Sequence, residues 1–240
     1  MTPAAVIFDF DGLVLETEWF IYASIDQVFR RHGTTLDEEL WRSFIGTTDH
    51  PHWVDILASQ IDTPLDREAL RAEGLAEDRS VLEALEVNVG VRELMAEAHS
   101  AGVPVGVASS SSRDWVEGHL RRLGLWGFVA ASATGDEVER TKPDPAVYLL
   151  AVDRLGVGPA GVLAIEDSPT GCRAAIAAGL SVLAVPSRMT VGLDFTHATA
   201  CVDSLHGVDL AALGRLGSEQ PGRPSPGHGS PGHGSPGSRW

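Results

Sequence analysis

Two aspartates, one residue apart, follow the first apolar run of the chain. Residues 6–12 read VIFDFDG, so Asp9 and Asp11 stand where an apolar strand stops and a glycine turn begins. Side chains alternate between the two faces of a strand, and we therefore expect both carboxylates to project the same way while Phe10 points into the core. Such a pair is tolerated best where a cation or a reacting proton lies between the two groups. The pair predicts a chemical site, and an Asp-Gly turn that ends a strand is the structural alternative.

Three later apolar runs also end on polar residues. Ser109 ends the run VPVGVAS, and Ser110 opens a serine-rich helix start whose free backbone N–H groups attract an anion. Lys142, in RTKPDP, is the only lysine of the chain, and its ammonium suits an attacking carboxylate and a phosphoryl oxygen together. Glu166 and Asp167 end VLAIED and offer the hard oxygen ligands that Mg²⁺ prefers. Because open α/β sheets bind ligands at the carboxyl ends of their strands, we expect these side chains to gather at one site.

The apolar runs alternate with amphipathic helical patterns, which predicts a doubly wound α/β fold with a parallel sheet. The expected strands cover residues 4–10, 103–109, 128–131, 162–166, 181–185 and 200–202. Roughly seventy residues without a convincing strand follow the first one, more than a simple βα unit needs. Their apolar residues recur at helical spacing, as in Ile21, Ile25 and Val28, and indicate an inserted α-helical cap. The predicted divisions are a core at 1–17 and 86–217, a cap at 18–85, and a disordered Pro/Gly/Ser/His tail at 218–240.

The composition excludes several classes of partner. The chain has 33 acidic and 18 basic residues in 240, a net charge of −15, which disfavours nucleic acid. No apolar run approaches the length of a membrane span, and the N-terminus lacks the pattern of a signal peptide. Cys172 and Cys201 are expected to be buried free thiols, as in a reducing compartment. We expect a cytoplasmic monomer or weak homodimer that binds neither nucleic acid nor membrane.

In this order and spacing, the four polar segments resemble the haloacid dehalogenase-like superfamily, and within it the β-phosphoglucomutase-like group. The segments are DFDGLVLET, Ser109, Lys142 in TKPDP, and GVLAIEDS, and the resemblance covers about residues 4–210. Members of this superfamily are mostly phosphatases. The resemblance implies a Rossmann-like core and a helical cap that closes over the site, excludes water and selects the leaving group.

The resemblance also implies a role for each site residue. Asp9 would attack phosphorus to form an aspartyl-phosphate, and Asp11 would protonate the leaving oxygen and then deprotonate water. Mg²⁺ would be held by Asp9, the backbone carbonyl of Asp11, Asp167 and, directly or through water, Glu166. The residues expected to bind the phosphoryl group are Ser109, Ser110, Lys142 and Thr17.

Three kinds of enzyme in this superfamily fit the sequence less well than a phosphatase does. A haloacid dehalogenase would lack Asp11, and a phosphonoacetaldehyde hydrolase would need a cap lysine, which this chain does not have. The cap histidine and phosphate-gripping arginine of the mutases correspond to Ile21 and Asp49, and a carboxylate would repel a second phosphate. We expect a phosphatase of a sugar or polyol phosphate. A β-phosphoglucomutase-type mutase is the alternative, and a non-catalytic phosphate-binding module is less favoured.

His50, His52 and Trp53 lie in the predicted cap, close after Asp49. Imidazole and indole groups hydrogen-bond to polar ligands and stack on them. These residues are candidates for substrate selection, and ordinary packing within the cap explains them equally well.

Overall fold

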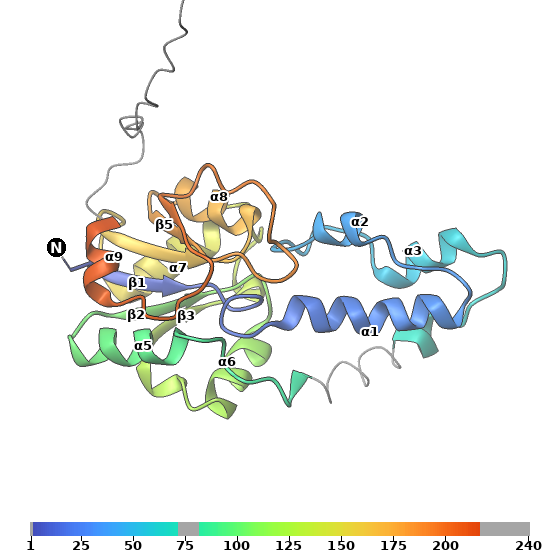
Figure 1. Ribbon diagram of the computed structural model, residues 1–240, viewed down its shortest axis with the longest axis horizontal. Helices are drawn as coiled ribbons and strands as arrows, with labels where there is room; N and C mark the ends of the chain where they lie inside the picture. Colours follow the sequence, from blue (N-terminus) through green and yellow to red (C-terminus); the bar gives the residue numbers. More distant parts are fainter. Residues whose placement is uncertain (1, 72–81, 217–240) are drawn as a thin grey trace, which may run out of the picture.

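The structure, a computed structural model, describes residues 2–71 and 82–216 of the chain. Its centre is a parallel sheet of six strands in the order β3-β2-β1-β4-β5-β6 (Figure 1). The strands are β1 (Ala5–Phe8), β2 (Val105–Ala108), β3 (Val129–Ala133), β4 (Val162–Glu166), β5 (Ser181–Ala184) and β6 (Ala200–Cys201). The predicted doubly wound α/β fold is therefore confirmed.

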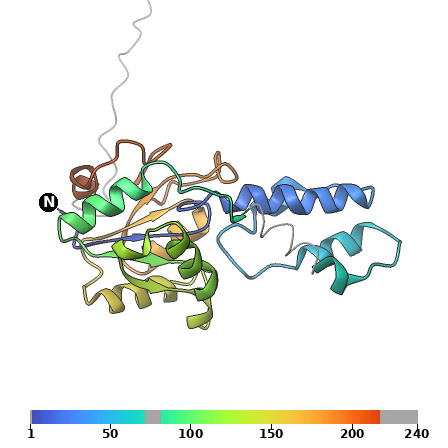
Figure 2. The same cartoon turned by 90° about the horizontal axis from the view of Figure 1, so that it is seen from below.

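Helices connect the strands and also form an arm beside the sheet (Figures 1 and 2). The helices are α1 (Thr17–Arg31), α2 (Glu38–Arg42), α3 (Trp53–Gln60), α5 (Val91–Ser100), α6 (Arg113–Arg122), α7 (Ala146–Leu155), α8 (Pro169–Ala177) and α9 (Leu210–Leu216), with short 3-10 turns η1 (Trp126–Phe128) and η2 (Gly135–Glu137). In the described ranges, no helix combines the length and the apolar character that crossing a bilayer requires.

The central strands are buried on both faces, which is why they read as continuous apolar runs. Val6 and Phe8 of β1 pack into a cluster with residues of α5 and α6, whereas Ala5 and Ile7 pack into the cluster that contains α7 and α8. The chain winds from β1 to β2 and β3 on one side and then returns to β4 on the other. The carboxyl ends of β1 and β4 therefore lie next to each other at the switch point, where ligands bind in such sheets.

Several predicted boundaries were wrong by a few residues. The first strand ends at Phe8 rather than at residue 10, although Phe10 is buried in the core as expected. The third strand is Val129–Ala133 because Phe128 belongs to η1 and the strand continues through small residues that carry little apolar signal. Cys172 is a buried free thiol, but Cys201 is exposed because β6 is the edge strand.

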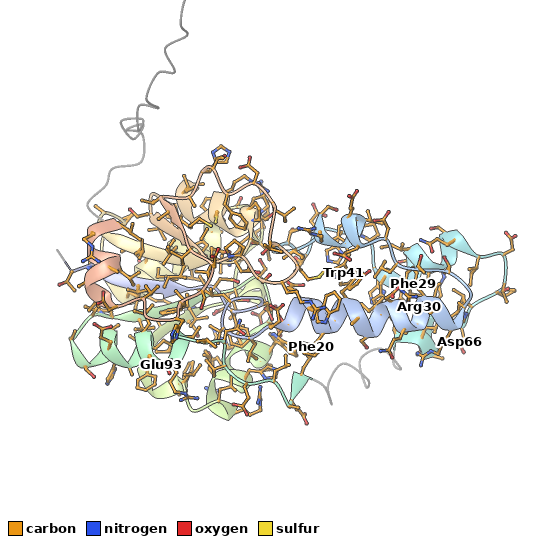
Figure 3. All side chains as sticks on the ribbon, viewed as in Figure 1. Phe20, Phe29, Arg30, Trp41, Asp66 and Glu93 are labelled. Atoms are coloured by element: carbon orange, nitrogen blue, oxygen red, sulfur yellow. The ribbon has the colours of Figure 1, made fainter. Side chains whose placement is uncertain are left out.

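The arm contains α1, α2 and α3 and has a hydrophobic cluster of its own (Figures 1 and 2). The cluster contains Tyr22, Ile25, Val28, Phe29, Leu36, Trp41, Ile45, Val54, Leu57, Leu70 and Met189. Figure 3 shows Phe29 and Trp41 within this arm. The separate cluster supports a cap at residues 18–85, and the exact division stays a prediction. Residues 72–81 of the predicted cap and the whole tail at 218–240 lie outside the described residues.

The chain passes between core and arm twice, and Asn88 ties the two passages together. Its side-chain amide donates to the carbonyl oxygens of Gly12 at 3.2 Å and of Leu13 at 2.9 Å. Its backbone N–H donates to the carbonyl of Val14 at 3.0 Å. The returning chain thereby holds the loop that carries the first aspartates.

We expect Asn88→Ala to lower the free energy of unfolding by about 1–3 kcal/mol, because the carbonyls of Gly12 and Leu13 lose their donors in a partly buried place. Urea unfolding followed by circular dichroism measures the change. Gln60→Ala, which removes an acceptor for Thr34 at an exposed position, is the control and should cost about 0.5 kcal/mol or less. Equal losses in the two variants would contradict this account of Asn88.

Candidate active site

The buried ammonium group of Lys142 lies at the centre of the site. Its Nζ donates to Asp9 Oδ1, to Glu166 Oε1 at 2.7 Å and to the carbonyl oxygen of Ala108 at 2.9 Å. The side chain is 1% exposed. Three acceptors use the three N–H bonds of the ammonium, and they come from the ends of β1, β2 and β4. The single lysine of the chain thus joins three strands at their carboxyl ends.

The carboxylates keep this lysine charged. Burial lowers the pKa of Lys142, but the charges of Asp9 and Glu166 and their hydrogen bonds outweigh burial and raise the pKa above its ordinary value. The ammonium is therefore available to stabilise negative charge at the carboxyl ends of the strands.

Asp9, Glu166 and Asp167 form an acidic cluster, each offering one oxygen within 4.8 Å of the others. Asp167 Oδ2 is buried and has no hydrogen-bond partner among the described residues. Gly12 has φ of +81°, and a Cβ atom on it would lie 2.0 Å from Asp167 Oδ2. Glycine therefore satisfies two demands here, a left-handed backbone and a close approach to the carboxylate. The structure brings together the three acidic side chains predicted to bind metal.

The cluster carries more negative charge than the lysine compensates. Burial, together with the charge of Glu166, raises the pKa of Asp9 to about 8, although Lys142 opposes this shift. Burial and then the charges of Asp9 and Glu166 raise the pKa of Asp167 well above its ordinary value. One ammonium faces three carboxylates, and a bound cation would favour the ionised forms. Hard carboxylate oxygens and an orphaned buried oxygen fit a divalent metal such as Mg²⁺.

The carboxylate of Asp11 has different partners from that of Asp9. It accepts hydrogen bonds from Thr17 Oγ1 at 3.1 Å and Trp115 Nε1 at 2.9 Å on one oxygen, and from Ser111 Oγ at 2.6 Å and Ser109 Oγ at 3.3 Å on the other. Strand alternation does not extend to Asp11, because β1 ends at Phe8. Four donors orient this carboxylate, and they come from the first turn of α1, from the segment between β2 and α6, and from α6 itself.

Two of these donors, Ser111 and Trp115, were not predicted from the sequence. Ser111 belongs to the serine-rich run that the sequence singles out, so position alone could have suggested it. Trp115 sits in an amphipathic helix, where an aromatic residue usually belongs to the core, and nothing local marks it as a partner of Asp11.

The residues predicted to bind phosphate do not all lie at the same place. Lys142 contacts Asp9, while Thr17 and Ser109 direct their hydroxyls to Asp11. Ser110 instead donates its hydroxyl to the carbonyl oxygen of Gly46, in the cap, at 3.2 Å. The structure therefore joins Ser110 to the cap, and its binding of phosphate stays a prediction.

Tyr148 is a further buried member of the site that sequence reasoning missed. Its hydroxyl donates to Glu166 Oε1 at 2.5 Å, and its ring lies 4.9 Å from the ammonium of Lys142. Burial and then the charge of Glu166 raise the pKa of Tyr148 well above its ordinary value, so the hydroxyl remains a donor. In the sequence this tyrosine falls on the apolar stripe of α7, where it looks like an ordinary core residue.

A cavity of about 300 Å³ lies in the cap, with residues of α1 in its wall. Its walls are Glu18, Ile21, Ile25, Trp41, Phe44, Ile45, Thr47, His50, His52 and Trp53. Burial, and then the charges of Asp11 and Asp9, raise the pKa of Glu18 to about 8. Glu18 is thus the wall residue of this cavity that the charges of Asp11 and Asp9 influence. The three predicted cap residues His50, His52 and Trp53 all line it.

The two histidines of this cavity are already engaged with the cap. His50 stacks on Phe44 with ring centroids 4.7 Å apart and planes at 9°. His52 Nδ1 accepts a hydrogen bond from the backbone N–H of Val54 at 3.2 Å and thereby caps α3. Burial and then the charge of Arg71 lower the pKa of His52, which keeps its imidazole neutral. These side chains therefore pack within the cap and also line the cavity, and their part in substrate selection stays a prediction.

The profile of the family described as Haloacid dehalogenase-like hydrolase matches residues 6–185 of the chain. The match spans β1 to the end of β5 and includes all four predicted segments. The chain belongs to this family, and the predicted resemblance to it is confirmed.

Two curated relatives and one solved structure illustrate the similarity. The chain is 37% identical over 209 residues to YhcW of Bacillus subtilis (strain 168), provisionally named a phosphatase, covering 87% of this chain and 95% of that protein. It is 33% identical to the phosphorylated carbohydrates phosphatase of Thermotoga maritima, covering 73% and 82%. It is 30% identical to the crystal structure of CbbY from Rhodobacter sphaeroides in complex with phosphate, with a TM-score of 0.72 and coverage of 88% and 99%. The expected enzyme class, a haloacid dehalogenase-like phosphatase, is confirmed.

The raised pKa values of Asp9 and Glu18 predict how stability depends on pH without metal. An acid whose pKa is raised to about 8 on folding binds more protons when folded than when unfolded between its unfolded value and 8. The free energy of unfolding in EDTA should therefore increase, by about 2 kcal/mol or more, as the pH falls from about 8.5 to about 7, since the raised pKa of Asp167 acts in the same direction. Urea unfolding at each pH measures this slope.

Asp9→Asn is the matched control for this slope, because it removes one of the acids with a raised pKa and keeps the shape of the side chain. We expect the variant to show a smaller pH dependence than the wild-type protein. A wild-type protein that loses stability as the pH falls from 8.5 to 7 would contradict the raised pKa values.

Proposed function

We propose that this hydrolase is a Mg²⁺-dependent phosphatase that hydrolyses a sugar or polyol phosphate through an aspartyl-phosphate on Asp9. The observation that carries the proposal is the buried pairing of Asp9 with Lys142 at the end of β1, beside an acidic cluster that contains an orphaned carboxylate oxygen. Phosphoryl transfer depends mainly on positioning and on stabilisation of charge, and this site offers both.

The proposed metal ligands are Asp9, Asp167, the backbone carbonyl of Asp11 and, directly or through water, Glu166. When bound, Mg²⁺ would supply positive charge to the phosphoryl oxygens and to the nucleophile. Glu166 also accepts from Lys142 and Tyr148, and these two donors hold its carboxylate in place. The carboxylates of Asp9 and Glu166 would thus be ordered before a metal binds.

Asp9 would act as the nucleophile, since an ionised carboxylate forms a covalent acyl phosphate with phosphorus. Its contact with Lys142 fixes one carboxylate oxygen. Because Lys142 has no spare N–H bond, a phosphoryl oxygen would share the ammonium with its present acceptors. Ser109 would add a hydroxyl donor at the end of β2.

Asp11 would transfer protons, first to the leaving oxygen and later from the attacking water. The hydroxyls of Thr17, Ser109 and Ser111 and the indole of Trp115 hold its carboxylate in a defined orientation. Correct orientation matters here because a proton donor must lie within hydrogen-bond reach of the leaving oxygen.

The cap cavity supports a hydroxylated leaving group. Trp41, Phe44 and Trp53 supply aromatic faces, while Glu18 and the histidines supply polar groups in the same wall. Sugars and polyols present C–H faces and hydroxyls, which such walls contact by stacking and hydrogen bonding. The name of the Thermotoga maritima relative, a phosphatase of phosphorylated carbohydrates, supports the same class of substrate.

A sugar phosphomutase remains the alternative because the core residues serve both reactions. Ile21 lines the cap cavity where a mutase would carry a histidine, and Asp49 is an exposed carboxylate in the neighbouring loop. Neither residue favours a second phosphate. A non-catalytic module is disfavoured because Asp9 and Asp11 are both present. The cytoplasmic location and the monomeric or weakly dimeric state stay predictions.

The direct test is release of inorganic phosphate from a panel of sugar, polyol and nucleotide monophosphates, with Mg²⁺ or with EDTA. We expect release only with Mg²⁺, and we expect Asp9→Asn to lower kcat by about a thousandfold or more because an amide is a poor nucleophile. Asp9→Asn should fold normally, since it removes a destabilised buried charge. Release by Asp9→Asn at the wild-type rate would refute the proposed nucleophile. Conversion of a hexose 1-phosphate to the 6-phosphate with a bisphosphate primer, without net release, would favour the mutase.

The cap cavity predicts a second outcome. Trp53→Ala should raise KM for the best sugar phosphate by about tenfold, because an aromatic wall is lost from the leaving-group cavity. Acetyl phosphate, whose leaving group is too small to use the cavity, should be hydrolysed at nearly the same rate by both proteins. Phe20→Ala is the control, since Phe20 lies on the outside of α1 at 36% exposure (Figure 3). A uniform loss on both substrates would contradict a role in selection.

A further inference from the structure

A turn after β5, residues 187–191, contacts both the cap and the acidic cluster. The loop that contains it is orange in Figure 1 and reaches the beginning of α1 in both ribbon views (Figures 1 and 2). Backbone hydrogen bonds from Thr190 N and Val191 N to the carbonyl of Ser187, at 3.1 and 2.9 Å, close the turn. No part of the proposed mechanism has used this segment so far.

On the core side, Thr190 holds the backbone of Asp167. Its Oγ1 donates to the carbonyl oxygen of Asp167 at 2.6 Å and accepts from the backbone N–H of Ser187 at 2.8 Å. The hydroxyl of Ser187 also lies 3.0 Å from Thr190 Oγ1. Thr190 is fully buried, so these bonds are shielded from water.

On the cap side, three residues of the turn contact the arm. Met189 is 1% exposed and belongs to the hydrophobic cluster of the cap, although it lies in the core part of the sequence. The guanidinium of Arg188 lies 3.3 Å from the centroid of the Trp19 ring, and its backbone N–H donates to Glu16 Oε2 at 3.2 Å. The carbonyl of Val191 accepts a hydrogen bond from Arg42 of α2. The turn therefore makes contacts with the cap as well as with the core.

The position of Asp167 depends on the turn 187–191, whereas Asp9 and Glu166 depend on Lys142. Asp9 and Glu166 are held through their carboxylates by Lys142. Asp167 Oδ2 has no such partner among the described residues. Asp167 is held instead by the turn, because Thr190 donates to its carbonyl oxygen and a hydrogen bond from the Ser187 side chain opposes the rise in the pKa of its carboxyl group. A displacement of the turn would consequently move this carboxylate relative to the other two.

We propose that Thr190 is a positioning residue for Asp167, and that the turn 187–191 couples seating of the cap on the core to the affinity of the acidic cluster for Mg²⁺. The inference rests on the proposed metal site. Since coupling between two equilibria is reciprocal, bound Mg²⁺ also favours the seated cap. Met189 is the residue through which the cap acts on the turn.

The first experiment measures the affinity of the full chain for Mg²⁺ by isothermal titration calorimetry with MgCl₂. Thr190→Val, which keeps the shape and removes the donor, should weaken binding by about tenfold, as loss of a group that orients a metal ligand commonly does. Thr190→Ser retains the hydroxyl and should bind within about threefold of wild type. Thr199→Val is the control, because Thr199 Oγ1 likewise accepts from a backbone N–H, that of Val182 at 3.0 Å, but makes no hydrogen bond to Asp167 within the described ranges. Wild-type affinity in Thr190→Val would overturn the positioning role.

The second arm tests the coupling to the cap. Met189→Ala should weaken Mg²⁺ binding by about threefold or more without touching Asp167, and Met189→Leu should restore it, because leucine refills the cluster. Met95→Ala makes a similar cavity in the core, on α5, and should leave the affinity unchanged. Circular dichroism confirms that each variant is folded at the temperature of the titration.

The outcomes separate this inference from the proposed function. A wild-type protein that does not bind Mg²⁺ would refute the metal site itself. Wild-type binding that neither Thr190→Val nor Met189→Ala weakens would refute only the inference. Weak binding in Thr190→Val together with normal binding in Met189→Ala would overturn the coupling and leave Thr190 as a positioning residue.

Discussion

The buried ion cluster around Lys142 constrains the rest of the structure. An ammonium removed from water costs several kcal/mol unless close acceptors replace its hydration. The acceptors are Asp9, Glu166 and the carbonyl of Ala108, which lie at the ends of three different strands. The order β2-β1-β4 must therefore bring these ends together. The same sheet that buries the apolar runs thereby also supplies the acceptors that replace the lost hydration of the lysine.

In the cluster around Lys142, acidic groups outnumber basic ones. Three carboxylates face one ammonium, and burial raises the pKa of Asp9 and Asp167 rather than lowering it. A core selected for stability alone would pair its charges or replace them with apolar side chains. The uncompensated charge lowers stability, and such a loss is expected at a site suited to bind a cation and a phosphoryl group. Stability and chemistry thus make opposite demands on the same side chains.

Among the described residues, the cap contacts the core through separate hydrogen bonds and through one hydrophobic side chain. Ser110 reaches the carbonyl of Gly46, Thr48 and Thr141 join their hydroxyls at 2.9 Å, and Met189 enters the hydrophobic cluster of the arm. Asn88 holds the two chain passages beside the first loop. A cap with its own core and a limited interface suits a part that selects the leaving group while the core performs the reaction.

The sequence by itself determined the α/β class, the inserted helices and the meeting of Asp9, Lys142, Glu166 and Asp167. This was possible because buried parallel strands have a local apolar signature and their carboxyl ends share one edge of the sheet. Only the tertiary structure decided the contacts of Trp115, Tyr148 and Thr190. It also gave the carboxylate of Asp11 a different set of hydrogen-bond donors from that of Asp9. These side chains come from an apolar helix stripe or an irregular turn, where no local pattern shows which distant group they will meet. Strand ends shifted for a related reason, since hydrogen bonds to neighbouring strands, and not hydrophobicity, set where a strand stops.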